Sequence, residues 1–192
     1  MLANDLLNGT TPPAGSVVTS LVGAPAGYAV DTNGLVSVPS GATSGQVSLN
    51  YQVCETAAPG NCASAGVTLL VSPSPADDVV STPAGTAVAG NVGSNDNVPP
   101  GATFGVPAGA PAGFQLLADG SFQYTPQAGT LGAQTVTYQV CLPAPFAATC
   151  GTATLVVNVN AGNLEAGDDD FRGTPLTAGT TTPSVLLNDR LD

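Results

Sequence analysis

Hydrophobic and polar residues alternate along several short stretches of the chain. In the second half, Val136, Tyr138 and Val140 alternate with polar residues, and residues 155–159 repeat the pattern. The stretch 47–53 shows the same alternation in the first half. Because successive side chains of a strand point to opposite faces, a period of two predicts β-strands with one buried side. No stretch combines helical periodicity with capping residues.

Turn signals separate these predicted strands. Asp119-Gly120 lies between the stretches 114–116 and 122–124, and Asn33-Gly34 is a similar dipeptide earlier in the chain. Both dipeptides are typical of tight β-hairpin turns. The 24 glycines and 17 prolines also disfavour long helices. Short strands with frequent turns predict an all-β fold of tandem immunoglobulin-like antiparallel β-sandwiches.

The sequence repeats itself. The stretch that begins at Ala24 aligns with the stretch that begins near Ala110, and an Asn-Asp pair begins at each of Asn4, Asn95 and Asn188. These pairs recur at intervals of a little over ninety residues, a length that suits one sandwich. The repeating unit is therefore one domain.

The ends of the chain do not coincide with the boundaries of the repeating unit. Residues 76–160 make one complete unit, which opens with acidic residues followed by a Thr-Pro pair. Residues 1–73 lack such an opening, and residues 166–192 contain only an opening. We therefore predict a first domain without its opening strands, a complete second domain, and the opening strands of a following domain. The two incomplete pieces together amount to about one more domain.

Composition narrows the functional class. The chain has 13 acidic and two basic residues, a formal net charge of −11, and neither histidine nor lysine. The acidic balance argues against nucleic acid and anionic membrane surfaces as partners. The lack of histidine and lysine excludes histidine-based catalysis and Schiff-base chemistry, and no apolar stretch is long enough for membrane insertion. With 43% hydrophobic residues a core is available, so we expect a structural protein and no enzyme.

Four motifs of the complete unit carry a family resemblance. They are the acidic opener Asp77-Asp78, the pair Asn95-Asp96, the hairpin at 119–126 and the Tyr-Gln-Val-Cys strand at 138–141. Together they resemble the bacterial Ig-like and cadherin-like repeats of large surface proteins. The resemblance implies tandem sandwiches in adhesins, stalks or fibres, located outside the cell or on a bacterial cell surface. It implies no single ligand.

The four cysteines fall into two close pairs, Cys54 with Cys62 and Cys141 with Cys150. Each pair joins the last two predicted strands of its unit. A zinc site would need four thiolates from two domains, and the spacing lacks a Cys-x-x-Cys motif. An even count in an oxidising compartment favours one local disulfide in each unit, and each would add at most about 2–3 kcal/mol by the loop-entropy estimate.

Acidic clusters near the predicted domain boundaries raise the possibility of calcium, which takes six to eight oxygen ligands. The alternative is solvated charge that keeps an alanine-rich surface soluble. The run Asn95-Asp96-Asn97-Val98-Pro99 resembles the cadherin linker motif but falls inside the unit, so we do not expect it to act as a linker. No other cofactor is required. The candidate calcium ligands are Asp77, Asp78, Asn95, Asp96, Asp168, Asp169, Asp170, Asn188 and Asp189.

The incomplete units suggest head-to-tail assembly into an extracellular fibre. The C-terminal strands of one copy would enter the first domain of the next, and such a heterologous contact propagates. One alternative is a spacer in the stalk of a giant adhesin, with adjacent repeats of the same chain as partners. Another is a glycan- or protein-binding module. The predicted assembly segment includes Thr174, Pro175, Leu176, Val185, Leu186 and Leu187.

Overall fold

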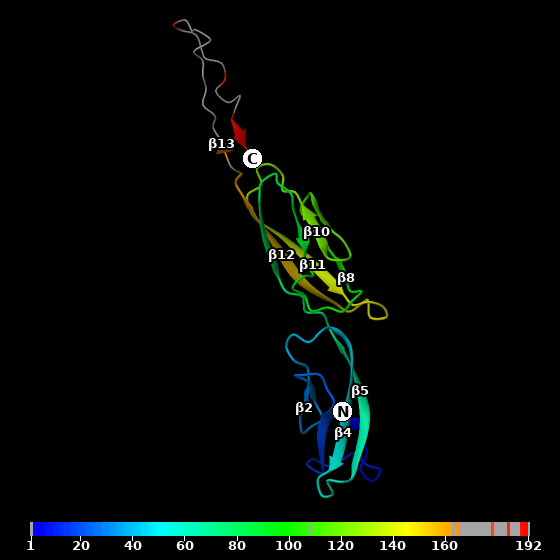
Figure 1. Cartoon of the computed structure of the whole chain (residues 1–192). Helices are drawn as coiled ribbons and strands as arrows, with labels where there is room; N and C mark the ends of the chain where they lie inside the picture. The colour runs from blue at the N-terminus through cyan, green and yellow to red at the C-terminus, as the bar shows by residue number, and fades with distance from the viewer. Residues whose placement is uncertain are drawn as a thin grey trace.

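The computed structural model describes residues 2–107, 109–162, 164–165, 178, 184 and 189–191. Two bodies built of β-strands lie end to end (Figure 1). A short 3₁₀ helix, η1 (Leu2–Asn4), begins the first domain. The strands of the first domain are β1 (Val17–Val22), β2 (Ala29–Val30), β3 (Val36–Ser37), β4 (Gly45–Glu55) and β5 (Cys62–Val71).

The second domain consists of two packed sheets. One has the strand order β6-β12-β11-β8 and the other the order β7-β10-β9. The strand β6 pairs in parallel with β12, and the other neighbours are antiparallel. The strands are β6 (Asp78–Pro83), β7 (Val88–Asn91), β8 (Thr103–Gly105), β9 (Phe114–Leu116), β10 (Ser121–Tyr124), β11 (Gly132–Cys141) and β12 (Cys150–Asn160).

The first domain repeats this arrangement with one strand fewer in each sheet. Its sheets have the orders β1-β4-β5 and β2-β3. By sequence and pairing, β4 and β5 correspond to β11 and β12, and β1 corresponds to β8. The hairpin β2-β3 corresponds to β9-β10. Within residues 2–71 nothing corresponds to β6 or β7.

The two domains differ in their cores. The large buried cluster belongs entirely to the second domain, where Val136, Tyr138 and Leu155 are at most 2% exposed. In the first domain the buried hydrophobic side chains are Leu49 and Tyr51. A sandwich with one strand fewer in each sheet has less apolar surface to bring together, so its core is smaller.

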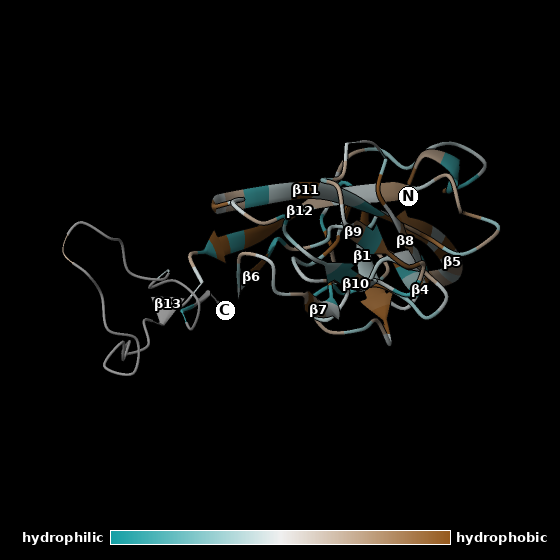
Figure 2. Cartoon of the chain, turned by 90° about the horizontal axis from the view of Figure 1, so that it is seen from above, coloured by the Kyte–Doolittle hydropathy of each residue, from teal (hydrophilic) through white to brown (hydrophobic). Residues whose placement is uncertain are grey.

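Local patterning explains the strands and turns. Hydrophilic and hydrophobic residues alternate along β11 (Figure 2), and its inward positions are the buried ones. The β9-β10 hairpin turns at Asp119-Gly120, where Gly120 has φ 85°, a conformation that glycine adopts at little cost. The predicted all-β, immunoglobulin-like sandwich is confirmed.

The chain continues beyond β12 into a short pair of strands. They are β13 (Leu164–Glu165) and β14 (Arg190–Leu191), which pair antiparallel. The predicted assembly residues between them, 174–176 and 185–187, lie outside the described residues.

Candidate functional site

The open side of the first domain distinguishes it from the second. In the second domain, β6 covers the outer edge of β12 from Leu155, opposite Asp78, to Asn160, opposite Pro83. The corresponding strand β5 pairs with β4 alone in the described part of the chain. Its outward N–H and C=O groups form a sheet edge, which can accept a further strand.

The inward side chains of β5 are incompletely covered as well. Leu69 and Val71 are only half-buried. Their counterparts on β12, Val157 and Val159, are 0% and 3% exposed. We call this open edge and the inward side chains of β5 the acceptor groove. An added strand would remove apolar surface from water, which is favourable.

A cavity of about 180 Å³ lies at the end of the acceptor groove. Its lining includes Asp5, Tyr51 and residues 62–65 of β5. In the second domain the corresponding place is filled by the chain that leads into β6. There Gly151, at the position of Ala63, packs so closely against the Pro73 carbonyl that it leaves no room for a Cβ atom.

A tyrosine and an aspartate occupy the same place in both domains. In the second domain, Ala76 links them, because its N–H donates to Asp96 Oδ1 (2.7 Å) and its carbonyl accepts from the Tyr138 hydroxyl (2.8 Å). In the first domain, the Tyr51 hydroxyl donates directly to Asp5 Oδ1 (2.8 Å). Asp5 Oδ2 is buried without a hydrogen-bond partner among the described residues. In the second domain, Tyr138 and Asp96 thus hold the chain that leads into β6. The corresponding residues of the first domain are Tyr51 and Asp5.

The carboxylates that open β6 are held by protein donors. Asp77 Oδ1 accepts from the Thr154 N–H and hydroxyl, each at 2.8 Å, and these bonds lower the pKa of Asp77. Asp78 Oδ2 lies 2.9 Å from the Tyr138 hydroxyl. Burial raises the pKa of Asp78, and the charge of Asp96 raises it further. Burial also raises the pKa of Asp96 and, together with Asp78, that of Tyr138.

Four of the predicted calcium ligands lie together at one end of the second domain. Asn95 Nδ2 donates to the Asp77 carbonyl (3.2 Å), and Asp78 and Asp96 share Tyr138 as a neighbour. No group of three or more acidic, cysteine or histidine side chains suited to a metal occurs in the described part of the chain. Calcium binding stays a prediction. Residues 168–170 and Asn188 lie outside the described residues, and Asp189 directly precedes β14.

Asn97 connects the two domains, which the sequence did not predict. Its Nδ2 donates to the Gly41 carbonyl, and its Oδ1 accepts from the Thr43 hydroxyl (2.9 Å). The Ser44 N–H donates to the Asn97 carbonyl (3.2 Å), and Ser44 is 5% exposed. We call these contacts the internal junction. Although Asn97 falls inside the repeat unit in sequence, its loop after β7 lies at the end that faces the first domain.

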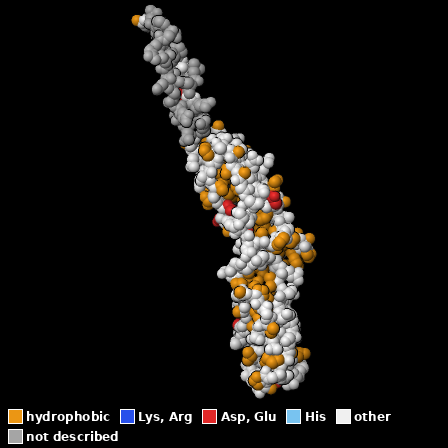
Figure 3. Space-filling model, viewed as in Figure 1, with side chains coloured by type: hydrophobic (Ala, Val, Ile, Leu, Met, Phe, Trp, Pro, Cys, Tyr) orange, Lys and Arg blue, Asp and Glu red, His pale blue; other side chains and the backbone are white. Residues whose placement is uncertain are grey.

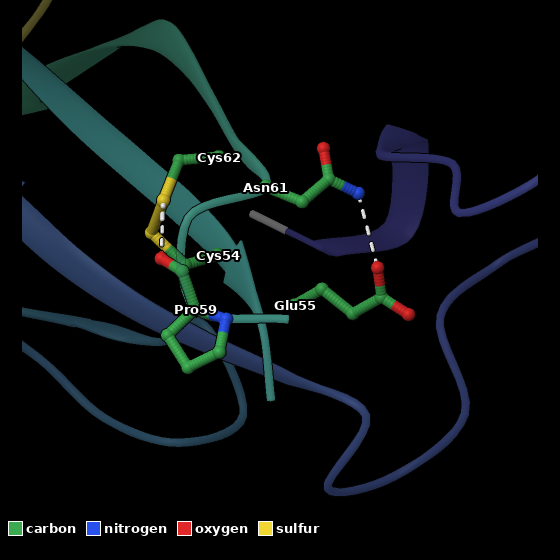
Figure 4. Close-up of a disulfide and its surroundings, with 5 residues drawn as sticks. All are labelled: Cys54, Glu55, Pro59, Asn61 and Cys62. Carbon is green, nitrogen blue, oxygen red and sulfur yellow. Dashed lines mark hydrogen bonds between the residues drawn. A yellow bond between two sulfur atoms is a disulfide. The ribbon is translucent and has the colours of Figure 1, made fainter. Parts of the chain in front are cut away.

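Both predicted disulfides are present. Cys54 is bonded to Cys62 between β4 and β5, and Cys141 to Cys150 between β11 and β12. Around the first bridge, Asn61 Nδ2 donates to Glu55 Oε2 (3.0 Å) across the same hairpin (Figure 4). Each bridge closes the end of the longest hairpin of its domain.

The visible face of the described residues carries many hydrophobic and few acidic side chains (Figure 3). Among those residues, no helix has the length and apolar character needed to cross a bilayer.

Comparison with known protein families finds a match, which covers the second domain. Residues 71–160 match the family described as bacterial Ig domain. The match ends with β12 and begins at the end of β5, in agreement with the domain boundary. None of the curated proteins matches the chain. An Ig-like domain of this kind is consistent with an adhesin or another surface module.

Several solved structures are similar at low identity. An endo-fucoidan hydrolase of glycoside hydrolase family 107, MfFcnA4, is 14% identical over 75% of this chain and 23% of its own, with a TM-score of 0.32. Mouse cadherin-23 repeats EC22-24 are 18% identical over 76% of this chain and 53% of theirs, with a TM-score of 0.30. Drosophila N-cadherin EC1-4 is 15% identical over 76% of this chain and 41% of its own, with a TM-score of 0.31. The chain spans 23–28% of the length of the hydrolases that it matches.

Proposed function

We propose that this chain is a structural, non-enzymatic subunit of an extracellular fibre that assembles head to tail. The C-terminal segment 166–192 of one copy occupies the acceptor groove of the next copy. The observation that carries the proposal is the difference between the domains: β12 is covered by β6, whereas β5 has an open edge and half-buried inward side chains.

The sequence of the C-terminal segment fits this role. It repeats the acidic opener and the Thr-Pro pair of the second domain, with Thr174 and Pro175 in the places of Thr82 and Pro83. Thr82 is 4% exposed, and its hydroxyl donates to the Thr86 carbonyl (2.9 Å). A threonine at this position therefore ends an opening strand inside a sandwich. Val185, Leu186 and Leu187 supply apolar residues for the second missing strand.

The chemistry of the groove supports a strand as its ligand. An incoming strand would pair with the outward backbone groups of β5 and cover Leu69 and Val71. Its first residues would enter the cavity beside Asp5 and Tyr51, as Ala76 lies beside Asp96 and Tyr138. The donor and the acceptor are different surfaces of the chain, so the contact repeats without closing and generates a fibre.

Disulfides and composition support the proposed location and the absence of catalysis. Both cysteine pairs are oxidised in the structure, and such bridges persist in extracellular compartments. The chain also has no histidine or lysine with which to build the commonest catalytic sites.

A second candidate function is that of a spacer within a longer adhesin. The observation that favours it is the covalent link between the two domains, because β5 continues through residues 72–77 directly into β6. A preceding repeat of the same polypeptide would fill the acceptor groove by the same route. The groove and its ligand are then unchanged, and only the covalent connection differs.

A competition experiment tests the proposal. The mass of the purified full chain is followed by size-exclusion chromatography with light scattering, with and without an excess of a synthetic peptide of residues 166–187. We expect multiples of the chain mass without peptide and a shift to single, peptide-bound chains with it. A peptide of scrambled sequence should have no effect.

Two other outcomes would count against the fibre. A chain that stays monomeric at high concentration but binds the peptide would favour the spacer. Assemblies that the peptide does not reduce would mean that the acceptor groove is not their contact.

A further inference from the structure

The internal junction shows how one domain of this chain meets the next. The loop before β4 presents Thr43 and Ser44, and the turn after β7 presents Asn97, whose side chain and carbonyl bond to that loop. The contact is polar, and Ser44 is buried in it. A domain of this type therefore contacts its neighbour through the residue before its long strand and through the third residue of an Asn-Asp-x turn.

The same two positions recur at the outer ends of the molecule. Thr130-Leu131 precedes β11 as Thr43-Ser44 precedes β4, because each is followed by the first glycine of its strand. At the other end, Asn4-Asp5-Leu6 corresponds to Asn95-Asp96-Asn97. The contact of Asp5 with Tyr51 supports this correspondence, because Asp96 lies beside Tyr138 in the same way.

Both outer positions carry exposed leucines. Leu131 is 57% exposed and Leu6 is 67% exposed. A single exposed leucine needs no explanation. Here, however, the polar pair of the internal junction is replaced by an apolar residue on each of the two surfaces that a head-to-tail contact would join.

We propose that Leu131 of one copy packs against Leu6 of the next copy, in the place that Ser44 and Asn97 occupy in the internal junction. This inference rests on the proposed head-to-tail order, and its partner surface is a second copy of this chain. The apolar pair also determines which domain contacts which along the fibre. A leucine opposite Ser44 or Asn97 would leave a polar group without its partner.

One competing arrangement follows from the sequence. The C-terminal Asn188-Asp189 pair is followed by Arg190, so a continuous chain would place Arg190 at the position opposite Leu131. The two arrangements therefore predict different neighbours for Leu131.

Cross-linking between two variants separates them. Leu6→Cys and Leu131→Cys are purified separately, mixed under assembly conditions, and treated with a short bis-maleimide. Because all four native cysteines are in disulfides, the new thiols are the reactive groups. We expect a cross-linked dimer in the mixture and none with either variant alone. Leu117→Cys is the matched control, because Leu117 is a 60% exposed leucine on the β9-β10 turn of the same domain.

The outcomes distinguish this inference from the proposed function. No assembly in any mixture would overturn both. Assembly in which Leu131→Cys reacts with Leu6→Cys no better than Leu117→Cys does would overturn only the Leu6–Leu131 contact. An intramolecular cross-link in the double variant Leu131→Cys/Arg190→Cys would also overturn it. Independently of cross-linking, Leu131→Asp should reduce the assembled fraction several-fold, and Leu117→Asp should leave it unchanged.

Discussion

At the scale of residues, the recurring Tyr-Asp pair is the most informative detail of the molecule. Tyr138 is 1% exposed, and its hydroxyl lies within hydrogen-bond distance of Ala76 and Asp78. It therefore fastens the opening strand to the centre of the sandwich. Tyr51 keeps the aspartate partner but has no opening strand beside it in the described part of the chain.

Removal of the two hydroxyls should have unequal effects. For Tyr138→Phe we expect a loss of roughly 1–3 kcal/mol in unfolding free energy, because buried polar groups of the opening strand lose their partner. For the matched change Tyr51→Phe we expect less, because the cavity beside it admits water as a substitute. Calorimetric unfolding of both variants measures the difference. Equal losses would contradict the assigned role of Tyr138.

The raised pKa of Asp78 predicts a pH effect. A carboxyl whose folded pKa is raised stabilises the fold most below its unfolded value of 3.8, and this contribution is lost as pH rises through the folded pKa. Asp78→Asn should therefore melt at a higher temperature than the natural chain at neutral pH. The advantage should shrink as pH falls through the raised folded pKa and should have disappeared below about 4, where Asp78 is protonated in both states. A constant advantage at all pH values would contradict this prediction.

At the scale of elements, β5 and β12 form a natural comparison. They correspond in sequence and pairing, and both close their hairpins with a disulfide. Among the described residues, a strand covers the outer edge of β12 but not that of β5. Their inward side chains differ in burial as expected when a strand covers one edge and, within the described residues, not the other.

Truncation of matched valines measures this difference. Val159→Ala on β12 should cost about 2 kcal/mol of unfolding free energy, and Val71→Ala on β5 less than about 1 kcal/mol, because Val71 is only partly buried. With an excess of the 166–187 peptide, the cost of Val71→Ala should approach that of Val159→Ala. Denaturant unfolding checks both values, and an unchanged cost in the presence of peptide would contradict occupation of the groove.

Sequence patterns predicted some of these elements and not others. Period-two alternation located β4, β11 and β12, and turn dipeptides located the β2-β3 and β9-β10 hairpins, because both signals are local. The parallel pairing of β6 with β12 joins Asp78 to Leu155, far apart in sequence, and no local pattern carries that information. The same reason explains why Asn97 was not expected at the internal junction, although the recurrence of Asp5 and Asp96 with a tyrosine could have indicated their contact.

At the scale of the whole molecule, the internal junction joins two domains through direct protein contacts. Asn97 bonds to the loop before β4 from three of its own atoms, and Pro99 packs near Gly45. These contacts join the second domain to the first through protein groups alone. A head-to-tail fibre would alternate this polar junction with the proposed Leu6–Leu131 contact.

Because the junction is made by protein groups, its geometry should not depend on calcium. The acidic side chains near it, Asp77, Asp78 and Asp96, already accept hydrogen bonds from protein donors. We expect the same maximum dimension by small-angle X-ray scattering, and the same melting temperature, in millimolar calcium chloride and in EDTA. A calcium-dependent rise in melting temperature would instead identify these residues as ligands.

Electron microscopy of the purified full chain, without denaturant, tests head-to-tail assembly most directly. We expect filaments whose axial repeat is two domains long, and we expect deletion of residues 166–192 to abolish them. Discrete two-domain particles from the full chain, indistinguishable from those of the deletion variant, would contradict the fibre.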